Sequence, residues 1–232
     1  MLGFSGSGFF GHTLSEVAAI LKENELTVPA VHTDLATLQT NMPAFGEIAQ
    51  TLDVNYVVLP AIPEEKRKTL DDYKYLADSF NQIGENAKKE GLQFAYHNHG
   101  YGLQEVNGQM PLQLLLDNTD PNLVFGELDI YWTTAGGINP VNLLEAYPNR
   151  YRLMHLKDMK EQVRFSGDGG DPMQWMQLFP YMTTAGDGVL NLPLLIEKGK
   201  ALGVQHFLVE QDMVAEPEVA LKRNFDYINN IL

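Results

Sequence analysis

Four short apolar segments of this chain end in side chains of the types that serve as metal ligands in proteins. The segments cover residues 94–99, 127–132, 154–158 and 208–212, and each has the pattern of a buried strand whose last residues turn polar. They supply His97, Asp129, His155 and Glu210. In a parallel (β/α) barrel, the functional side chains come from the carboxyl ends of several strands. The pattern therefore predicts one shared site at the open end of such a barrel.

Apolar runs alternate with amphipathic segments along the chain. Strands are expected at 2–4, 27–32, 56–60, 92–97, 123–129, 151–156 and 206–210. Helices are expected at 13–25, 42–52, 69–90, 111–118, 140–146, 192–202 and 216–232. This alternation indicates parallel βα units, of which a complete barrel needs eight. The glycine-containing stretch 159–188 is expected to be functional or to carry small elements of its own.

Composition narrows the class of protein. The 232 residues suffice for one sizeable domain, and because no repeat or linker divides them we expect a single domain over 1–232. A net charge of −14 argues against a nucleic-acid or membrane partner, since both need a basic surface. The absence of cysteine excludes thiolate ligands. Because no signal peptide or membrane span is predicted, a cytoplasmic location is expected, with a periplasmic one open if the N-terminus is truncated.

Further motifs accompany the four strand ends. They are Gly-His-Thr at 11–13, Tyr-His-Asn-His at 96–99, Leu-Asp-x-Tyr-Trp at 128–132, Gly-Gly-x-x-Pro at 136–140, His-Leu-Lys-Asp at 155–158, Gly-Asp-Gly at 186–188 and Val-Glu-Gln-Asp at 209–212. In order and spacing they resemble the xylose isomerase-like TIM barrels, also described as sugar phosphate isomerases/epimerases, and most of all the branch with Tyr-His-Asn-His. The resemblance covers essentially the whole chain.

The chain departs from this family in two ways. Family members begin with one more βα unit before the segment that matches residues 2–6, so the resemblance implies a (β/α) TIM barrel that lacks its first β-strand and helix. A truncation, or a barrel completed by a partner chain, would each explain this. Many relatives also have a glutamate at the first metal position, where this chain has His97. That replacement weakens the case for a two-glutamate epimerase mechanism.

The resemblance implies that His97, Asp129, His155 and Glu210 hold one divalent metal ion. Two nitrogen and two oxygen ligands suit Mn²⁺, Co²⁺, Fe²⁺ or Zn²⁺, with manganese as the leading expectation. Glu210 is the expected base, because its family counterpart is both ligand and base. His97 and Lys157 are candidates for the second acid or base that an epimerisation requires.

Four other side chains are expected to contact a sugar substrate, and these are His32, His99, Trp132 and Asp212. His99 is also a candidate for the second acid or base. Two residues have structural alternatives. Trp132 would by default pack in the core. Lys157 would either contact the substrate and support the enediolate or form an ion pair with Asp158, Asp212 or Glu127.

The implied chemistry is proton abstraction next to a carbonyl, through a metal-stabilised ene-diolate, in a sugar isomerase or epimerase. One alternative is a metal-dependent lyase or deglycosidase that acts on 3-keto-glycosides. Another is a non-catalytic sugar-binding subunit. No arginine falls at a predicted strand end, which favours an unphosphorylated sugar. The family barrels often assemble as dimers or tetramers, so a homo-oligomer is an expectation of the resemblance alone.

Overall fold

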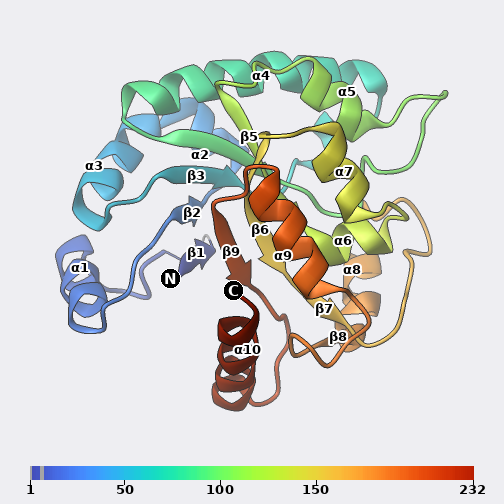
Figure 1. Ribbon diagram of the computed structural model, residues 1–232. Coiled ribbons are helices and arrows are strands. Elements are labelled where there is room, and N and C mark those ends of the chain that lie inside the picture. Colours follow the sequence, from blue (N-terminus) through green and yellow to red (C-terminus); the bar gives the residue numbers. More distant parts are fainter. Residues whose placement is uncertain (1, 6–7) are drawn as a thin grey trace. The chain divides into compact units, whose positions relative to one another are not determined.

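The computed structural model describes residues 2–5 and 8–232, in which strands and helices alternate (Figure 1). Its strands are β1 (Gly3–Ser5), β2 (Ala30–His32), β3 (Tyr56–Leu59), β4 (Gln93–His97), β5 (Val124–Asp129), β6 (Tyr151–Leu156), β7 (Asp158–Met159), β8 (Met182–Thr183) and β9 (His206–Val209). Its helices are α1 (Leu14–Glu23), α2 (Leu35–Thr40), α3 (Met42–Leu52), α4 (Leu70–Lys89), α5 (Pro111–Asp117), α6 (Ile130–Ala135), α7 (Pro140–Ala146), α8 (Pro172–Leu178), α9 (Leu192–Ala201) and α10 (Pro217–Ile231), with 3₁₀ turns η1 (Glu64–Lys66) and η2 (Phe179–Tyr181).

Within this described part of the chain, seven strands form one sheet in the order β1-β2-β3-β4-β5-β6-β9. The contacts divide the chain into two compact units. The first unit contains residues 1–97 and 112–126, and the second unit contains residues 98–111 and 127–232. Strand β5 therefore contributes its beginning to the first unit and its end to the second.

The first unit is built on strands β1 to β4, which pair in parallel with their neighbours. All four residues of β3 are buried, as expected for a parallel strand covered on both faces. Helix α4 packs against β4, and the centroids of the Phe80 and Phe94 rings lie 5.1 Å apart. The helix begins with a capping box in which Thr69 and Asp72 exchange hydrogen bonds.

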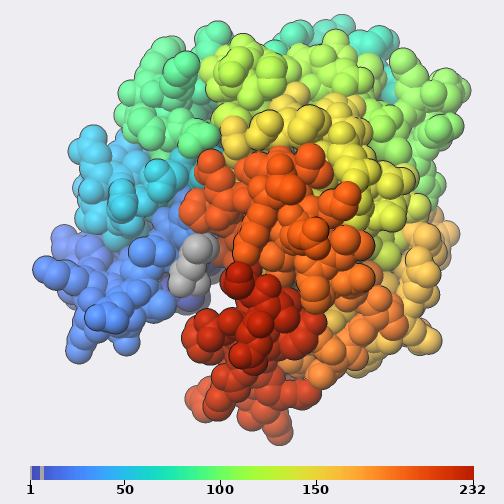
Figure 2. Space-filling model, viewed as in Figure 1, coloured from blue at the N-terminus to red at the C-terminus, as the bar shows by residue number. Residues whose placement is uncertain are grey.

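The second unit contains the end of β5 together with β6 and β9, and β6 pairs in parallel with β9. Helix α9 packs against β6 and α7. Between β6 and α9, the chain forms the antiparallel pair β7–β8 and the short helix α8. Helix α10 (dark red) lies at the surface in Figure 2, and its exposed apolar side chains include Leu221 and Phe225.

The predicted alternation of strands and helices is confirmed, and most boundaries agree within three residues. Two helices were not predicted. Helix α2 begins where Asp34 accepts a hydrogen bond from the Thr37 backbone N–H, and α6 begins directly after Asp129. The stretch 159–188 carries small elements, as expected.

Among the described residues, none of the helices is both long and apolar enough to cross a membrane. The single domain over 1–232 stays a prediction.

Candidate metal centre

The second unit gathers three of the predicted metal ligands at the carboxyl ends of its strands. Asp129 is the last residue of β5, His155 lies one residue before the end of β6, and Glu210 directly follows β9. Strands β6 and β9 pair with Leu156 opposite Val209, and the Glu210 backbone N–H donates to the Leu156 carbonyl at 3.3 Å. The strand register thus brings His155 and Glu210 to the same edge of the sheet.

The ligand atoms of these residues lie close together. The Nδ1 atom of His155 is 2.6 Å from Oε2 of Glu210 and 3.8 Å from Oδ2 of Asp129, and one ligand atom from each residue falls within 4.8 Å of the others. Asp129 and His155 are buried, whereas the Glu210 side chain is 34% exposed. One nitrogen and two carboxylate oxygens at this separation fit a divalent transition metal.

A third buried side chain, Glu127, supports this assignment. Its Oε1 atom lies 3.3 Å from Nε2 of His155, and Glu127 has no exposed surface. A histidine that binds a metal commonly donates its other ring N–H to a carboxylate, which fixes the tautomer and the ring orientation. With Glu127 on Nε2, the Nδ1 atom of His155 is turned toward Asp129 and Glu210, which is the arrangement that a metal ligand requires.

Lys157 is the cation of the site, and its side chain is only 3% exposed. Its Nζ atom lies 2.8 Å from Oε2 of Glu210 and 3.1 Å from Oδ2 of Asp129. A third carboxylate, that of Asp212, lies 3.3 Å away. The expected ion pair with Asp212 is therefore present. The Asp158 carboxylate instead accepts hydrogen bonds from backbone N–H groups, among them those of Gly186 and Gly188.

Burial and charge act in opposite directions on the two basic groups. Burial disfavours the charged form of Lys157, but the carboxylates of Asp129, Glu210 and Asp212 outweigh it and raise the Lys157 pKa above its ordinary value. Burial likewise opposes the charge on His155, and the neighbouring carboxylates again raise its pKa. The pKa of Asp212 is raised, chiefly by burial. Without a metal ion, the site is thus stabilised by its own cations.

Two hydrogen-bonding side chains fix the backbone around Asp129. Its Oδ1 atom accepts from the Trp132 backbone N–H at 2.8 Å, which caps helix α6. The Asn98 amide accepts from the Asp129 backbone N–H at 3.2 Å and donates to the Thr133 hydroxyl at 3.0 Å. Asn98 is the residue after β4 and is 2% exposed. Its buried side chain therefore links the end of β4 to the start of α6.

An aromatic cluster lies beside these groups in the same unit. The ring of His99 is stacked 4.4 Å from Trp175 and 5.9 Å from Trp132, and Phe165 stacks on Trp132 at 5.6 Å. The Nζ atom of Lys157 is 5.3 Å from the centroid of the Trp132 ring. The segment between β6 and α9 thus supplies Phe165 and, from helix α8, Trp175. These two side chains pack against two predicted substrate residues, His99 and Trp132.

The other two predicted residues, His97 and His32, belong to the first unit. His97 ends β4, and His32 ends β2. Their rings lie 6.0 Å apart at 39°, and Nδ1 of His97 is 3.2 Å from the carbonyl oxygen of Pro60. Their roles as ligand and substrate contact stay predictions.

Sequence reasoning missed the roles of Glu127 and Asn98. Glu127 stands two residues before Asp129, and alternate residues of a strand point to the same side. A carboxylate two positions before a predicted ligand in an otherwise apolar run was therefore an available signal. Asn98 gave no such signal, because its hydrogen bonds depend on how β4 and β5 meet.

Comparisons with known proteins agree with this architecture. A model of the xylose isomerase-like TIM barrel matches residues 6–197. An inosose dehydratase from Geobacillus thermodenitrificans is 28% identical over 162 residues, which cover 68% of this chain and 52% of that protein. The chain spans about half the length, or less, of the curated relatives it matches.

Solved structures resemble the chain over nearly its whole length. A sugar phosphate isomerase/epimerase from Parabacteroides distasonis has a TM-score of 0.79 at 23% identity, over 98% of this chain and 82% of that one. The IolI protein, solved with a zinc atom, has a TM-score of 0.73 at 18% identity, over 99% and 88% of the two chains. The predicted fold class is confirmed, and the chain belongs to the xylose isomerase-like TIM barrel family.

Proposed function

We propose that this protein is a divalent-metal-dependent sugar isomerase or epimerase that removes a proton next to a carbonyl. The observation that carries the proposal is the cluster of Asp129, His155 and Glu210, with ligand atoms within 4.8 Å of one another and Glu127 on the far ring nitrogen of His155. Burying a histidine together with several carboxylates costs desolvation free energy. A cation bound by the same side chains would offset that cost. The donor set matches Mn²⁺, Co²⁺, Fe²⁺ or Zn²⁺, and we expect Mn²⁺.

The fourth ligand in this proposal is His97. It is joined directly to Asn98, whose amide is hydrogen-bonded to the backbone of Asp129. The assignment of His97 rests on its place at the end of β4, where the sequence pattern predicts a ligand. When bound, the divalent ion would polarise the substrate carbonyl and stabilise negative charge on its oxygen.

The proton is moved by Glu210. Its side chain is one third exposed, whereas Asp129 and His155 are buried, so Glu210 has the access to substrate that a base needs. Lys157 holds the Glu210 carboxylate at 2.8 Å and also provides a positive charge toward a substrate oxygen. A second acid or base on the opposite face of the substrate, as epimerisation requires, would come from His97, with Lys157 and His99 as the other candidates.

Substrate contacts are proposed for His32, His99, Trp132 and Asp212. The stack of His99 with Trp132 offers an aromatic surface to a sugar ring, and the Asp212 carboxylate is one third exposed and held by Lys157. A small-molecule sugar is the substrate class that fits these groups, because hydrogen-bonding side chains lie beside an aromatic surface.

The second candidate function is a lyase, and the curated relatives named inosose dehydratase favour it. Elimination starts with the same removal of a proton by Glu210, and then a leaving group departs from the neighbouring carbon instead of a proton returning. A lyase that acts on 3-keto-glycosides would use the same residues. The two functions therefore differ in what leaves the intermediate, and only product analysis separates them.

Solvent exchange tests the shared step. Protein loaded with Mn²⁺ is incubated in D₂O with ketoses, inososes or 3-keto-glycosides, and deuterium incorporation and products are followed by NMR. We expect exchange at one substrate carbon, reduced by about 10²- to 10⁴-fold in Glu210→Gln and unchanged in the exposed control Glu47→Gln. Asp129→Ala should lose the bound metal, as measured by plasma mass spectrometry.

The outcomes divide the candidate functions. Exchange with an altered sugar as product supports an isomerase or epimerase, and exchange with loss of water or an alcohol supports a lyase. Sugar binding without exchange at any C–H would leave the non-catalytic sugar-binding subunit. A protein that takes up no metal from Mn²⁺ or Co²⁺ solutions would overturn both enzymatic functions.

A further inference from the structure

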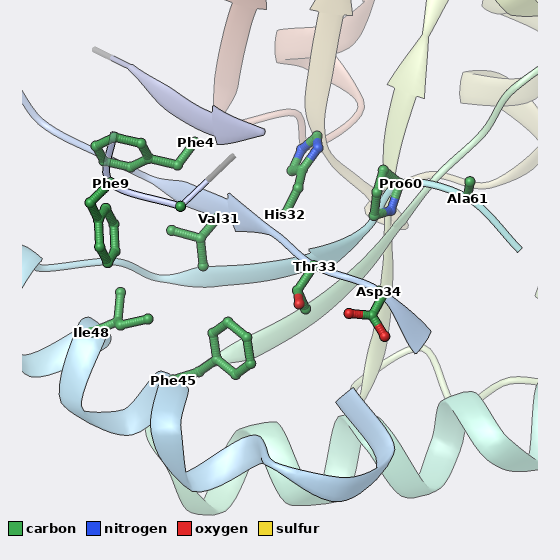
Figure 3. A pocket seen from close by; sticks show the side chains of 11 residues that line it. Phe4, Phe9, Val31, His32, Thr33, Asp34, Phe45, Ile48, Pro60 and Ala61 are labelled. Carbon is green, nitrogen blue, oxygen red and sulfur yellow. The ribbon is translucent and has the colours of Figure 1, made fainter. Parts of the chain in front are cut away.

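Two histidines are proposed to contact the substrate, and they belong to different units. His32 lies in the first unit, where it lines a cleft of about 470 Å³ together with apolar side chains such as Val31 and Phe45 (Figure 3). His99 lies in the second unit, together with three of the proposed metal ligands. The contacts of His99 and those of the metal cluster therefore occur within one compact unit.

Trp175 of helix α8 stacks closely on the imidazole of His99. The ring centroids are 4.4 Å apart, and the planes differ by 24°. Trp132 and Tyr101 are also stacked relative to His99, at the longer centroid distances of 5.9 Å and 6.1 Å. Because Trp175 covers one face of the imidazole, a turn of the His99 ring would break this contact.

The indole of Trp175 is held in place by the backbone of its own segment. Its N–H donates to the Gly169 carbonyl at 2.6 Å, and the Gly169 N–H donates to the Gln174 side chain at 2.9 Å. Gly169 has a φ of +72°, and a Cβ atom there would lie 2.8 Å from the backbone of Gly100. The segment thus passes directly against the residue that follows His99, which brings Trp175 to the imidazole.

Helix α8 provides a fixed base for Trp175. The helix ends at Leu178, whose side chain is buried in the same apolar cluster as Tyr131 of helix α6. The Tyr131 hydroxyl donates to the Leu178 carbonyl at 2.5 Å. Because α6 begins directly after Asp129, the helix that carries Trp175 is tied to the segment that follows a proposed metal ligand.

We propose that Trp175 is a positioning residue for substrate binding, and that it acts through His99. The stacked indole holds the imidazole in the orientation in which its ring nitrogens bind the substrate, which lowers the loss of side-chain entropy on binding. The inference rests on the proposed function, because that function makes His99 a substrate contact. It extends the site to residues 160–181, which supply no other residue of the proposal.

Sugar affinity measures this role without turnover. Metal-loaded protein is titrated with myo-inositol and with methyl β-glucoside, which have no carbonyl group and cannot react by the proposed chemistry. Trp175→Leu removes the aromatic ring and should weaken binding about three- to ten-fold. Trp175→Phe keeps a stacked ring and should retain most of the affinity. The control Met173→Ala changes an exposed side chain of the same helix and should leave the affinity unchanged.

A double-mutant cycle with His99→Gln tests whether Trp175 acts through His99. A positioning role predicts that Trp175→Leu causes a further loss of less than about two-fold once His99 has been replaced. A role in packing alone predicts equal losses in both backgrounds. If Trp175→Leu does not fold, as judged by circular dichroism, Trp175→Met takes its place in the cycle.

The stack itself has a spectroscopic signature. In protein with isotope-labelled histidine, the ring protons of His99 should resonate upfield, because the ring current of the Trp175 indole shields nuclei that lie above its face. The signals are assigned by their absence in His99→Gln. They should move downfield in Trp175→Leu and stay upfield in Trp175→Phe.

Three results would overturn the inference: equal losses in both backgrounds, no binding of either sugar by the wild type, or His99 signals that do not move in Trp175→Leu. Metal uptake and deuterium exchange, measured on the wild type as above, test the proposed function separately. Exchange with equal losses refutes the positioning role and leaves the function standing. Losses that depend on His99, without metal uptake or exchange, refute the function and leave sugar binding through His99.

Discussion

Replacement of Lys157 by methionine should destabilise the metal-free protein strongly. Lys157 is 3% exposed, and its partner Asp129 has no exposed surface, so the variant leaves a buried carboxylate without its cation. Loss of one partner from a buried ion pair costs about 3–5 kcal/mol. The contacts with Glu210 and Asp212 add little to this figure, because both carboxylates are one third exposed and water screens them.

The size of the effect makes it measurable by thermal or urea unfolding followed by circular dichroism. In a chain of this length, 1 kcal/mol corresponds to a shift in Tm of about 2–4 °C, so the variant should melt roughly 6–20 °C below the wild type. The control is Lys198→Met, which removes an exposed ion pair with Glu145 and should change the Tm only slightly.

Addition of Mn²⁺ should narrow the gap between the Lys157→Met variant and the wild type. Asp129 and Glu210, two of the residues that would hold the metal ion, are also ion-pair partners of Lys157, so a bound cation would restore the charge that the variant lacks. A Tm within about 2 °C of the wild type without metal would refute the assignment of Lys157 as a buried counter-charge. A gap that Mn²⁺ leaves unchanged would show that the metal does not bind these oxygens.

Three further substitutions, each measured by urea unfolding, test one loop contact beside the site and two features of helix α4. Asp158→Ala removes a buried acceptor of several backbone hydrogen bonds and should cost about 3 kcal/mol or more, whereas a loss below about 1 kcal/mol would contradict its role in the loop. Gly84→Ala places a Cβ atom 2.5 Å from the Leu123 carbonyl oxygen and should cost about 1–3 kcal/mol, and a neutral result would refute this close approach. Thr69→Ala breaks the capping box of α4 and should cost about 1 kcal/mol, with Thr69→Ser as the control that retains most of it.

The strand ends were predictable because their pattern is local. Buried parallel strands have apolar interiors, so a polar residue such as His155 at the end of a run marks the edge of the sheet. Sequence alone could not say which carboxylate pairs with Lys157, because the answer depends on how β5, β6 and β9 lie side by side. For the same reason Asp158 was only one of three expected partners of Lys157, together with Asp212 and Glu127; Asp212 forms the ion pair, and Asp158 instead binds the backbone of residues 186–190.

Short elements escaped prediction for a related reason. Helix α2 has six residues, too few for a periodic pattern to be distinguished from a loop, and its start is defined by the hydrogen bonds of Asp34. Helix α6 is buried along its length and therefore has no polar face to reveal its period. The aromatic cluster was only partly foreseen, since Phe165 reaches Trp132 through a loop whose path the sequence does not specify.

The charges of the site explain why a cation is central to the proposed chemistry. Asp129, Glu210 and Asp212 face Lys157, and Glu127 faces His155. With all four carboxylates ionised and His155 neutral, as a metal ligand would be, Lys157 alone leaves an excess of three negative charges. Such an excess is unfavourable in a largely buried site, because solvation is lost and like charges repel. A divalent ion reduces the excess to one, and that charge falls on Glu210 or Asp212, the two carboxylates with access to solvent. The same ion that balances the buried charge would therefore leave an ionised carboxylate at the surface of the site, which is the group that proton abstraction requires.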